Sequence, residues 1–306
     1  MTTASDGTEG GRIRALFRTS ETQVTIIAPF IKKNALKALL DVVPDGVHVR
    51  CVTRWRSHEV AAGVSDPEIL DILEGRGSFS LSVVDELHAK LYVAGERCLA
   101  GSANVTLAGL GERADGGNIE VLVEASVSDP AIVATLTKIA DLERPATRAM
   151  AVSVRRLADV LATGSPEAPT AELGWFPRSR RPERAFRYYS APPEGFLGAA
   201  DRLLLGDLAG ADVPPGLSEG EFREGMRRSL RSTPAGQYVL DAESDALVTR
   251  SDISPSLEHA ASRGGASPED LWRAFVEWMS HFFPDYLTKQ PVSDVALRRA
   301  RLLEPK

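Results

Sequence analysis

The chain has 306 residues, 43% of them hydrophobic and 25% charged, a composition typical of a globular protein with enough material for two domains. Its formal net charge of −6 argues against a uniformly basic nucleic-acid-binding protein, so such a role would have to rest on local sites. No apolar run is long enough to span a bilayer, and the polar N-terminus lacks the pattern of a signal peptide. We therefore expect a cytoplasmic protein without a membrane partner.

The first half of the chain alternates strand-like and helix-like patterns. Apolar runs typical of strands occupy residues 23–30, 47–55, 79–85, 89–94, 97–102 and 118–125. Helical spacing occurs at 31–43, 66–74 and 129–143, with Asp66 expected as the N-cap of the second of these helices. Gly95-Glu96 predicts a tight hairpin. This order predicts an α/β domain with a mixed sheet.

The pattern changes after about residue 150. Helical segments are expected at 151–163, 196–208, 218–231 and 267–283, and a hairpin at 236–250. The stretch from 164 to 195 is rich in Pro, Arg and Ser and is typical of a linker or irregular segment. We therefore predict a catalytic domain at 1–163, a linker at 164–195 and a mostly helical accessory domain at 196–306.

The two cysteines, Cys51 and Cys98, both lie inside apolar, strand-like runs. This placement favours buried thiols in a reducing compartment over a disulfide or a metal site. We expect no metal and no cofactor.

His88 and Lys90 mark the candidate site. Side chains two residues apart on a strand point to the same face, and burying an imidazole and an ammonium together is costly without a partner. An anion would supply that partner. The turn Gly101-Ser102-Ala103-Asn104 follows, where small residues would let backbone amides approach a ligand and Asn104 could donate from its side chain.

Residues 105–110 are expected to form a short helix whose N-terminus adds further amide donors. An isolated H-x-K pair is usually structural, and a lone G-S-x-N turn is an equally weak signal. The ordered set of H-x-K, hairpin, G-S-x-N and N-x-E is what predicts a phosphate site.

This ordered set resembles the HKD motif of the phospholipase D superfamily, H-x-K-x4-D-x6-G-S-x-N. The segment 25-TIIAPFI-31 also looks like the family's first strand and the loop after it. The resemblance implies an α-β-α sandwich around a mixed sheet and metal-independent phosphodiester chemistry. It departs from the pattern at the aspartate, whose position is taken by Gly95 with Glu96 beside it. Shortened motifs of this kind are a feature of the branch that resembles metal-independent restriction endonucleases.

The resemblance also implies roles for individual residues. His88 would be the nucleophile that forms a phosphohistidine, and Lys90 and Asn104 would bind the non-bridging phosphate oxygens. Glu120 would hold the other ring nitrogen of the histidine. Two residues would line the substrate side of this site, Ser102 and Asn118.

Phosphodiester cleavage by this route needs one imidazole to attack and a second to protonate the leaving oxygen. The chain has five histidines, and none of the other four is followed by x-Lys or by a G-S-x-N turn. One chain therefore supplies half a site, which predicts a homodimer with a composite site across a two-fold axis.

Several other polar residues have weaker signals. His48 lies within a strand pattern and is expected to be structural, whereas His58 is expected in the loop that follows the strand. Arg54 and Arg56 could contact substrate backbone at the end of that strand or lie in a solvated loop, and Trp55 would either stack on a base or anchor the loop. Candidate backbone contacts further along are Arg178, Arg180, Arg181, Arg184 and Arg187.

The sequence thus predicts a phosphodiesterase acting as a nuclease on DNA or RNA, in bacterial restriction or anti-phage defence with a defence-system partner protein. Two alternatives stay open. One is a phospholipase or phosphatidyl transferase, and the other is a catalytically silent phospholipase D-like subunit of a defence complex.

Overall fold

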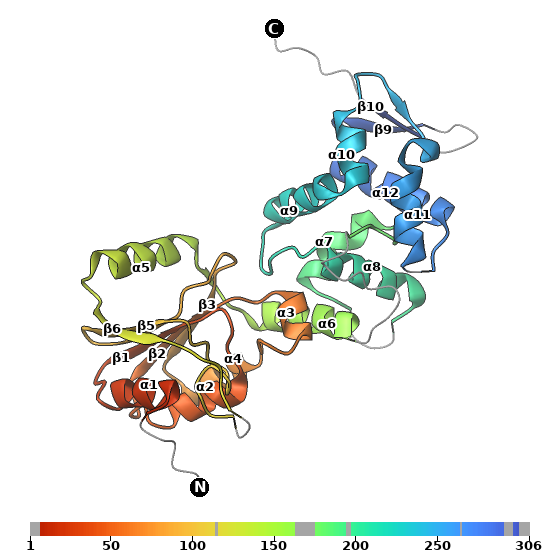
Figure 1. Ribbon diagram of the computed structural model, residues 1–306. Helices are drawn as coiled ribbons and strands as arrows, with labels where there is room; N and C mark the ends of the chain where they lie inside the picture. Colours follow the sequence, from red (N-terminus) through yellow and green to blue (C-terminus); the bar gives the residue numbers. More distant parts are fainter. Residues whose placement is uncertain are drawn as a thin grey trace. The chain divides into compact units, whose positions relative to one another are not determined.

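The computed structural model describes residues 7–113, 116–162, 175–193, 197–263, 265–290 and 296–299. The chain divides into two compact units, Met1–Val152 and Ser153–Lys306 (Figure 1). The boundary lies inside helix α6 (Arg148–Ala162), whereas we expected a boundary at 163/164. In the described part of the chain, no helix combines the length and apolarity that crossing a membrane requires.

Unit 1 is built on a seven-stranded mixed sheet with the order β6-β5-β4-β1-β2-β3-β7. Its first three strands are parallel, and every other neighbour pair is antiparallel. β6 and β7 therefore form the two edges. The strands are β1 (Gln23–Ile27), β2 (His48–Thr53), β3 (Phe79–Val83), β4 (Leu91–Ala94), β5 (Arg97–Gly101), β6 (Leu122–Ser126) and β7 (Arg144–Pro145).

Helices cover both faces of this sheet. α1 (Glu9–Arg18), α2 (Lys33–Leu40) and α4 (Ile69–Arg76) lie on one face, and α5 (Pro130–Leu142) lies on the other (Figure 1). The buried side of α2 carries Leu36, Leu39 and Leu40, the three leucines whose spacing predicted it. The predicted fold class, an α/β sandwich with a mixed sheet, is confirmed.

Most of the predicted strands of unit 1 are present with shorter bounds. The hairpin at Gly95 is also present, with the glycine at a φ of 59°, a conformation that favours glycine. Asp66 is not the N-cap of α4. It instead accepts from the backbone N–H of Lys33, 2.9 Å away, and from Lys32 Nζ, so it stabilises the start of α2. Three elements were not predicted: α1, α3 (Ser57–Ala61) and β7.

Unit 2 is mostly helical, as predicted for the second half of the chain. Its helices are the C-terminal part of α6, α7 (Ala185–Ser190), α8 (Ala199–Gly210), α9 (Glu219–Ser232), α10 (Pro234–Asp241), α11 (Ser254–Ser262) and α12 (Pro268–Phe282), with short 3-10 helices at Pro182–Arg184 and Arg250–Ile253. A small antiparallel sheet has the order β8-β10-β9, from β8 (Leu247–Val248), β9 (Leu287–Gln290) and β10 (Ala296–Arg299). α12 lies at the centre, with Phe275 and Trp278 fully buried.

Two predictions for this half are wrong. The hairpin at 236–250 is absent, because 234–241 form α10 and the strand β8 pairs with β10 from the end of the chain. The described part of the expected linker, 175–193, packs into the core of unit 2. Trp175 there contacts Trp278 edge to face at 5.9 Å, and Phe176 stacks on Phe275 at 5.2 Å. The rest of that segment, 164–174 and 194–195, lies outside the described residues.

Candidate active site

The candidate site lies at one end of unit 1, where three extended segments meet. His88 and Lys90 precede β4, the turn 101–104 follows β5, and Asn118 and Glu120 precede β6. We expected residues 88–90 and 118–120 to be part of strands, but β4 begins at Leu91 and β6 at Leu122. Antiparallel pairing of β4, β5 and β6 brings all three segments together, with Gly101 N donating to Lys90 O at 3.2 Å.

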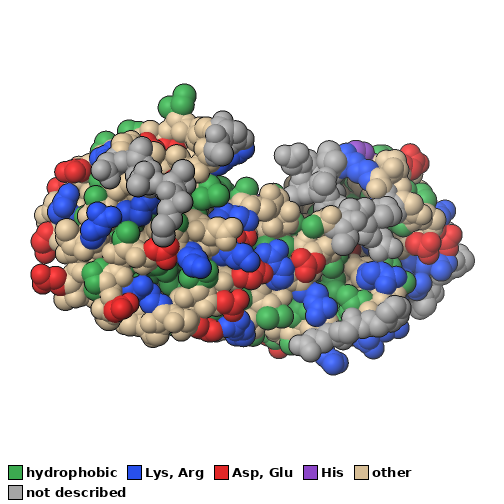
Figure 2. All heavy atoms as spheres, turned by 90° about the horizontal axis from the view of Figure 1, so that it is seen from below, with side chains coloured by type: hydrophobic (Ala, Val, Ile, Leu, Met, Phe, Trp, Pro, Cys, Tyr) green, Lys and Arg blue, Asp and Glu red, His purple; other side chains and the backbone are tan. Residues whose placement is uncertain are grey.

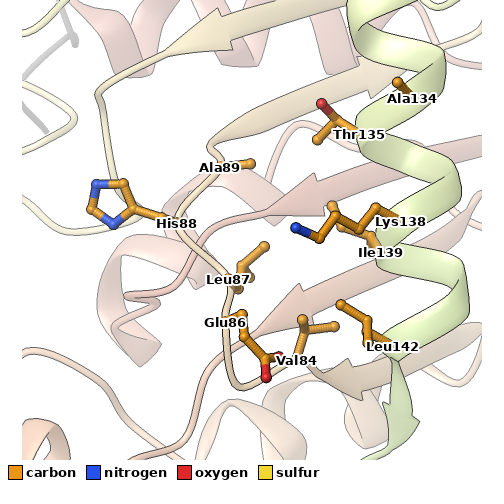
Figure 3. A pocket seen from close by; sticks show the side chains of 10 residues that line it. All are labelled: Val84, Glu86, Leu87, His88, Ala89, Ala134, Thr135, Lys138, Ile139 and Leu142. Atoms are coloured by element: carbon orange, nitrogen blue, oxygen red, sulfur yellow. The ribbon is translucent and has the colours of Figure 1, made fainter.

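His88 is exposed, and its side chain makes no hydrogen bond with any described residue. Its imidazole points away from α5, whereas Ala89, one residue on, points toward that helix (Figure 3). Behind the histidine, between residues 84–89 and α5, lies a mostly apolar cavity of about 390 Å³. Its lining is Val84, Glu86, Leu87, His88, Ala89, Ala134, Thr135, Lys138, Ile139 and Leu142. The ring is thus presented to solvent on the side opposite the cavity.

Lys90 is buried, with 8% of its surface exposed, and its Nζ donates to the backbone oxygen of His88 at 2.7 Å. Burial lowers the pKa of Lys90, the nearby Arg54 lowers it further, and the carboxylate of Glu120 acts in the opposite direction. An ammonium has three protons to donate, and one is used here. Lys90 therefore keeps donor capacity for an anion.

Asn118 and Ser102 both bind Glu120. The Ser102 hydroxyl donates to Glu120 Oε2, and Asn118 Nδ2 donates to Oε1 at 3.1 Å. No hydrogen bond joins Glu120 to His88 within the described chain. Glu120 is thus oriented by two neighbours, and the pairing with its own histidine that the resemblance implied is not present in the single chain.

Asn104 lies on the turn after β5, where the buried Tyr92 hydroxyl donates to Ala103 O at 2.7 Å. The amide of Asn104 has no hydrogen-bond partner among the described residues, and its Oδ1 is buried. Oδ1 can accept a hydrogen bond, and the Nδ2 group of the same amide can donate one. Asn104 therefore has capacity to bind a ligand.

The glycine turn has a different role from the one expected. A Cβ on Gly101 would lie 1.8 Å from Val121 O, so the glycine lets the segment before β6 approach β5 rather than letting a ligand approach. Ser102 N donates to Val121 O at 3.0 Å. The backbone amides of Gly101 and Ser102 are therefore already bonded.

The short helix expected at 105–110 is wrong. These residues form hydrogen-bonded turns, in which Leu110 N donates to Thr106 O at 2.8 Å. Val105 N donates to Phe30 O and Thr106 N to Asn104 O, so neither amide is free for an anion. The side-chain donors at the site are Lys90, Asn104 and His88.

Arg54 positions the histidine segment. It binds the buried carboxylate of Glu59 through two nitrogens, Nε at 3.1 Å from Oε2 and Nη2 to Oε1, and its Nη1 donates to Leu87 O at 3.0 Å. It also lies over the Phe30 ring, 5.4 Å from the centroid. Arg54 thus fixes the residue before His88. Glu59 was not singled out in the sequence, where the R-x4-E spacing was its signal.

The other residues near the end of β2 lie apart from these contacts. Arg56 precedes α3, and its positive charge lowers the pKa of Asp85, whereas burial raises that pKa. Asp85 is salt-bridged to Arg144 at 2.8 Å. Trp55 is fully buried, which fits an anchor and excludes stacking on a base in this conformation. His58 lies in α3, not in a loop.

Two predictions of structural roles are confirmed. The ring nitrogens of His48 lie 3.2 Å from Ser78 Oγ and 3.1 Å from Ser80 Oγ. Cys51 and Cys98 are both buried free thiols, and burial raises the pKa of Cys51 to about 12. Among the described residues, no three His, Cys, Asp or Glu side chains are grouped so as to hold a metal ion.

Charge is distributed over the surface without a single basic face in the view of Figure 2, where Lys and Arg side chains are interspersed with Asp and Glu. This agrees with the net charge of −6. Recognition of an anion has to come from local groups of residues.

No protein-family model matches this sequence, and no curated protein matches it either. Among solved structures, the chain is similar to NucT from Helicobacter pylori, with 12% identity and a TM-score of 0.33 over 43% of this chain and 84% of NucT. It is also similar to TrmBL2, described as an archaeal chromatin protein with a novel mode of DNA binding, with 15% identity and a TM-score of 0.27 over 42% of this chain and 45% of that one. Neither similarity is close enough to bear on function.

Proposed function

We propose that the chain is a metal-independent phosphodiesterase that cleaves nucleic acid through a phosphohistidine intermediate, in an active site shared by two copies. One observation carries the proposal: His88 has an exposed imidazole without a hydrogen bond to any described residue, and its backbone oxygen accepts from the buried ammonium of Lys90, which has two further protons to donate. The unpaired amide of Asn104 adds a third group with unused capacity. The order of these residues in the HKD-like motif supports the reaction type.

The reaction needs two histidines. One ring nitrogen of His88 attacks phosphorus, the P–O bond to the leaving oxygen breaks, and the partner's His88 donates a proton to that oxygen. Water then attacks phosphorus, the P–N bond breaks, and the partner's His88 accepts the proton of the water. Lys90 and the Asn104 amide stabilise charge on the non-bridging oxygens throughout.

The edge of the sheet offers a place for the second copy. Ile119, Val121 and Val123 are 104%, 57% and 54% exposed, and they lie on or just before the edge strand β6. An exposed edge with a row of apolar side chains is a ready surface for pairing with another chain. Because Asn118 and Glu120 are sequence neighbours of these residues, a copy paired along this edge would lie beside the site. Glu120 would then be within reach of the partner's His88.

The biological setting that we propose is bacterial restriction or anti-phage defence, with a defence-system partner protein. Its support is the motif, because small single-motif dimers of the superfamily that it resembles are typically bacterial nucleases, often in restriction or anti-phage systems.

The first test is cleavage of labelled single- and double-stranded DNA and RNA in excess EDTA. We expect wild-type protein to cut at least one of these substrates and His88→Ala to lose the activity by a factor of about 10³ or more. His259→Ala is the matched control, since His259 is also exposed but lies on α11 in unit 2. Equal cutting by wild type and His88→Ala would overturn the proposal.

The second test is subunit mixing. Wild type and His88→Ala are mixed in equal amounts and allowed to exchange subunits. If a shared site needs both histidines, the mixture has about one quarter of the activity of pure wild type at the same total protein concentration. Independent sites would leave about one half. Ile119→Asp should give inactive monomers by light scattering, whereas Leu247→Asp, which changes an exposed leucine of β8, should leave the dimer intact.

The lipid alternative is favoured by one observation, the same exposed row of Ile119, Val121 and Val123, which could contact a membrane surface. Release of choline from phosphatidylcholine vesicles by wild type but not by His88→Ala, without cleavage of nucleic acid, would establish that alternative. Nucleic-acid binding without turnover of either substrate would establish the silent subunit.

A further inference from the structure

The four arginines of α9 in unit 2 have two different roles. Arg223 Nη1 donates to His281 O at 3.0 Å, and Arg227 Nε donates to Phe282 O at 2.7 Å. Both acceptors are among the last carbonyls of α12, which have no partner within their own helix. These two arginines therefore stabilise the C-terminus of α12, and the positive charge also suits the helix dipole there.

Arg228 and Arg231 have no such role. Both are exposed, and neither makes a hydrogen bond or an ion pair with any described residue. Their spacing of three places them on the same side of the helix, where like charges destabilise each other. An anion bound by both would remove that repulsion.

These side chains border a hollow of about 190 Å³, lined by Glu224, Arg227, Arg228, Arg231, Phe283 and Tyr286. Its one carboxylate is paired, since Glu224 Oε1 lies 2.6 Å from Arg227 Nη1. Arg228 and Arg231 thus leave two uncompensated positive charges. Phe283 is buried, and Tyr286 keeps 39% of its surface exposed.

We propose that this hollow binds a phosphate group of a single-stranded nucleic acid, with Arg228 and Arg231 on the phosphate oxygens and Tyr286 stacked on an adjacent base. Guanidinium groups match phosphate oxygens in geometry and charge, and an exposed aromatic ring beside them stacks on unpaired bases. The hollow is smaller than the roughly 300 Å³ of the smallest typical small-molecule pockets, which fits one phosphate of a longer strand better than a whole free ligand. The site does not depend on the chemistry at His88.

The test is binding of a fluorescein-labelled, 20-nucleotide single-stranded DNA, followed by anisotropy in a His88→Ala background so that no cleavage occurs. Arg228→Gln with Arg231→Gln should weaken binding about tenfold or more. It should also reduce the slope of log K against log salt by about 0.7, the value for one lost phosphate contact on a single strand. Glutamine keeps the helix propensity of α9. Arg18→Gln with Lys37→Gln, at exposed positions of α1 and α2, changes the net charge equally and should alter binding less than twofold.

Tyrosine variants test the stacking. Tyr286→Ala should weaken binding about fivefold or more, and Tyr286→Phe should bind like the parent protein. Unchanged binding in the double arginine variant, or competition by poly-glutamate as effective as by unlabelled DNA, would overturn the proposal.

A second readout separates this site from the proposed reaction. The double arginine variant with His88 intact should hydrolyse bis(p-nitrophenyl) phosphate, a substrate too small to reach two sites, at the wild-type rate. If binding depends on Arg228 and Arg231 but the protein hydrolyses no substrate, the proposed phosphate site is supported and the proposed reaction is contradicted. A lower rate on this small substrate in the arginine variant would contradict the separation.

Discussion

Lys90 in unit 1 and Asp207 in unit 2 are both buried ionisable side chains, yet their surroundings differ. Asp207, on α8, is fully buried and accepts from the backbone N–H groups of Arg178 at 2.9 Å and Ser179 at 2.7 Å. Lys90 makes one hydrogen bond and lies near another cation, Arg54. Burial alone therefore does not mark a functional site. The distinguishing feature of the candidate site is a buried cation with unused donor capacity two residues from the exposed His88.

The largest expected effect comes from Lys90→Met, which keeps the size and removes the charge. Cleavage should fall about 10²- to 10³-fold, because the cation that we propose for the non-bridging oxygens is lost. The free energy of unfolding should stay the same or rise, since burial of the ammonium and its repulsion by Arg54 are both relieved. Initial rates in EDTA and urea denaturation measure the two quantities. A destabilised variant that keeps its activity would show that Lys90 is structural.

In contrast to Lys90→Met, Asp207→Ala should lower the stability of the protein. It leaves the backbone N–H groups of half-buried Arg178 and buried Ser179 without an acceptor, which should lower the free energy of unfolding of unit 2 by about 2–4 kcal/mol. Three of the four tryptophans, Trp175, Trp272 and Trp278, are in the core of that unit, so their fluorescence reports on it. The control is Asp241→Ala, at an exposed carboxylate ending α10, where we expect a change below about 0.5 kcal/mol. Equal effects of the two substitutions would contradict a structural role for Asp207.

A pH series gives the smallest of the three effects. Burial raises the pKa of Asp207 to about 6, above its ordinary value of 3.8. The folded state therefore holds the proton more tightly than the unfolded chain. Its contribution to stability is fully present below about pH 4, is lost as pH rises to about 6, and does not change further above that.

The free energy of unfolding of wild type relative to Asp207→Asn should accordingly fall by about 2–3 kcal/mol between pH 4 and pH 7. Urea denaturation at several pH values measures this difference. A difference that does not depend on pH would show that Asp207 titrates normally in the folded protein.

Elements with regular periodicity could be predicted from the sequence. The strands β1, β2 and β3 and the helices α2, α5 and α12 are close to their expected positions, because their burial follows the period of one element. The segment 175–193 could not be predicted in this way. Its Pro- and Arg-rich composition resembles a linker, but Trp175, Phe176, Tyr188 and Tyr189 are buried against helices far away in the sequence.

The failure at 105–110 has a similar cause. The apolar residues Val105 and Leu110 suggested a helix, but Val105 forms a bridge to Ile31 and donates to Phe30 O, so the backbone is held by tertiary pairing. At 236–250 the sequence suggested two paired strands. The partner of β8 is β10, some fifty residues later, and no local pattern encodes that pairing.

The sequence alone determined the candidate half-site, since His88, Lys90, Ser102, Asn104 and Glu120 follow one another in a recognisable order along adjacent extended segments. It also determined the alternation of strands and helices that makes the fold α/β. Tertiary structure decided how these groups are used: Gly101 makes room for Val121, Arg54 turns to Glu59 and Leu87, and Ser102 and Asn118 orient Glu120. The physical reason is that local patterns encode backbone conformation and burial. Hydrogen-bond partners depend instead on which distant segments the sheet order brings together.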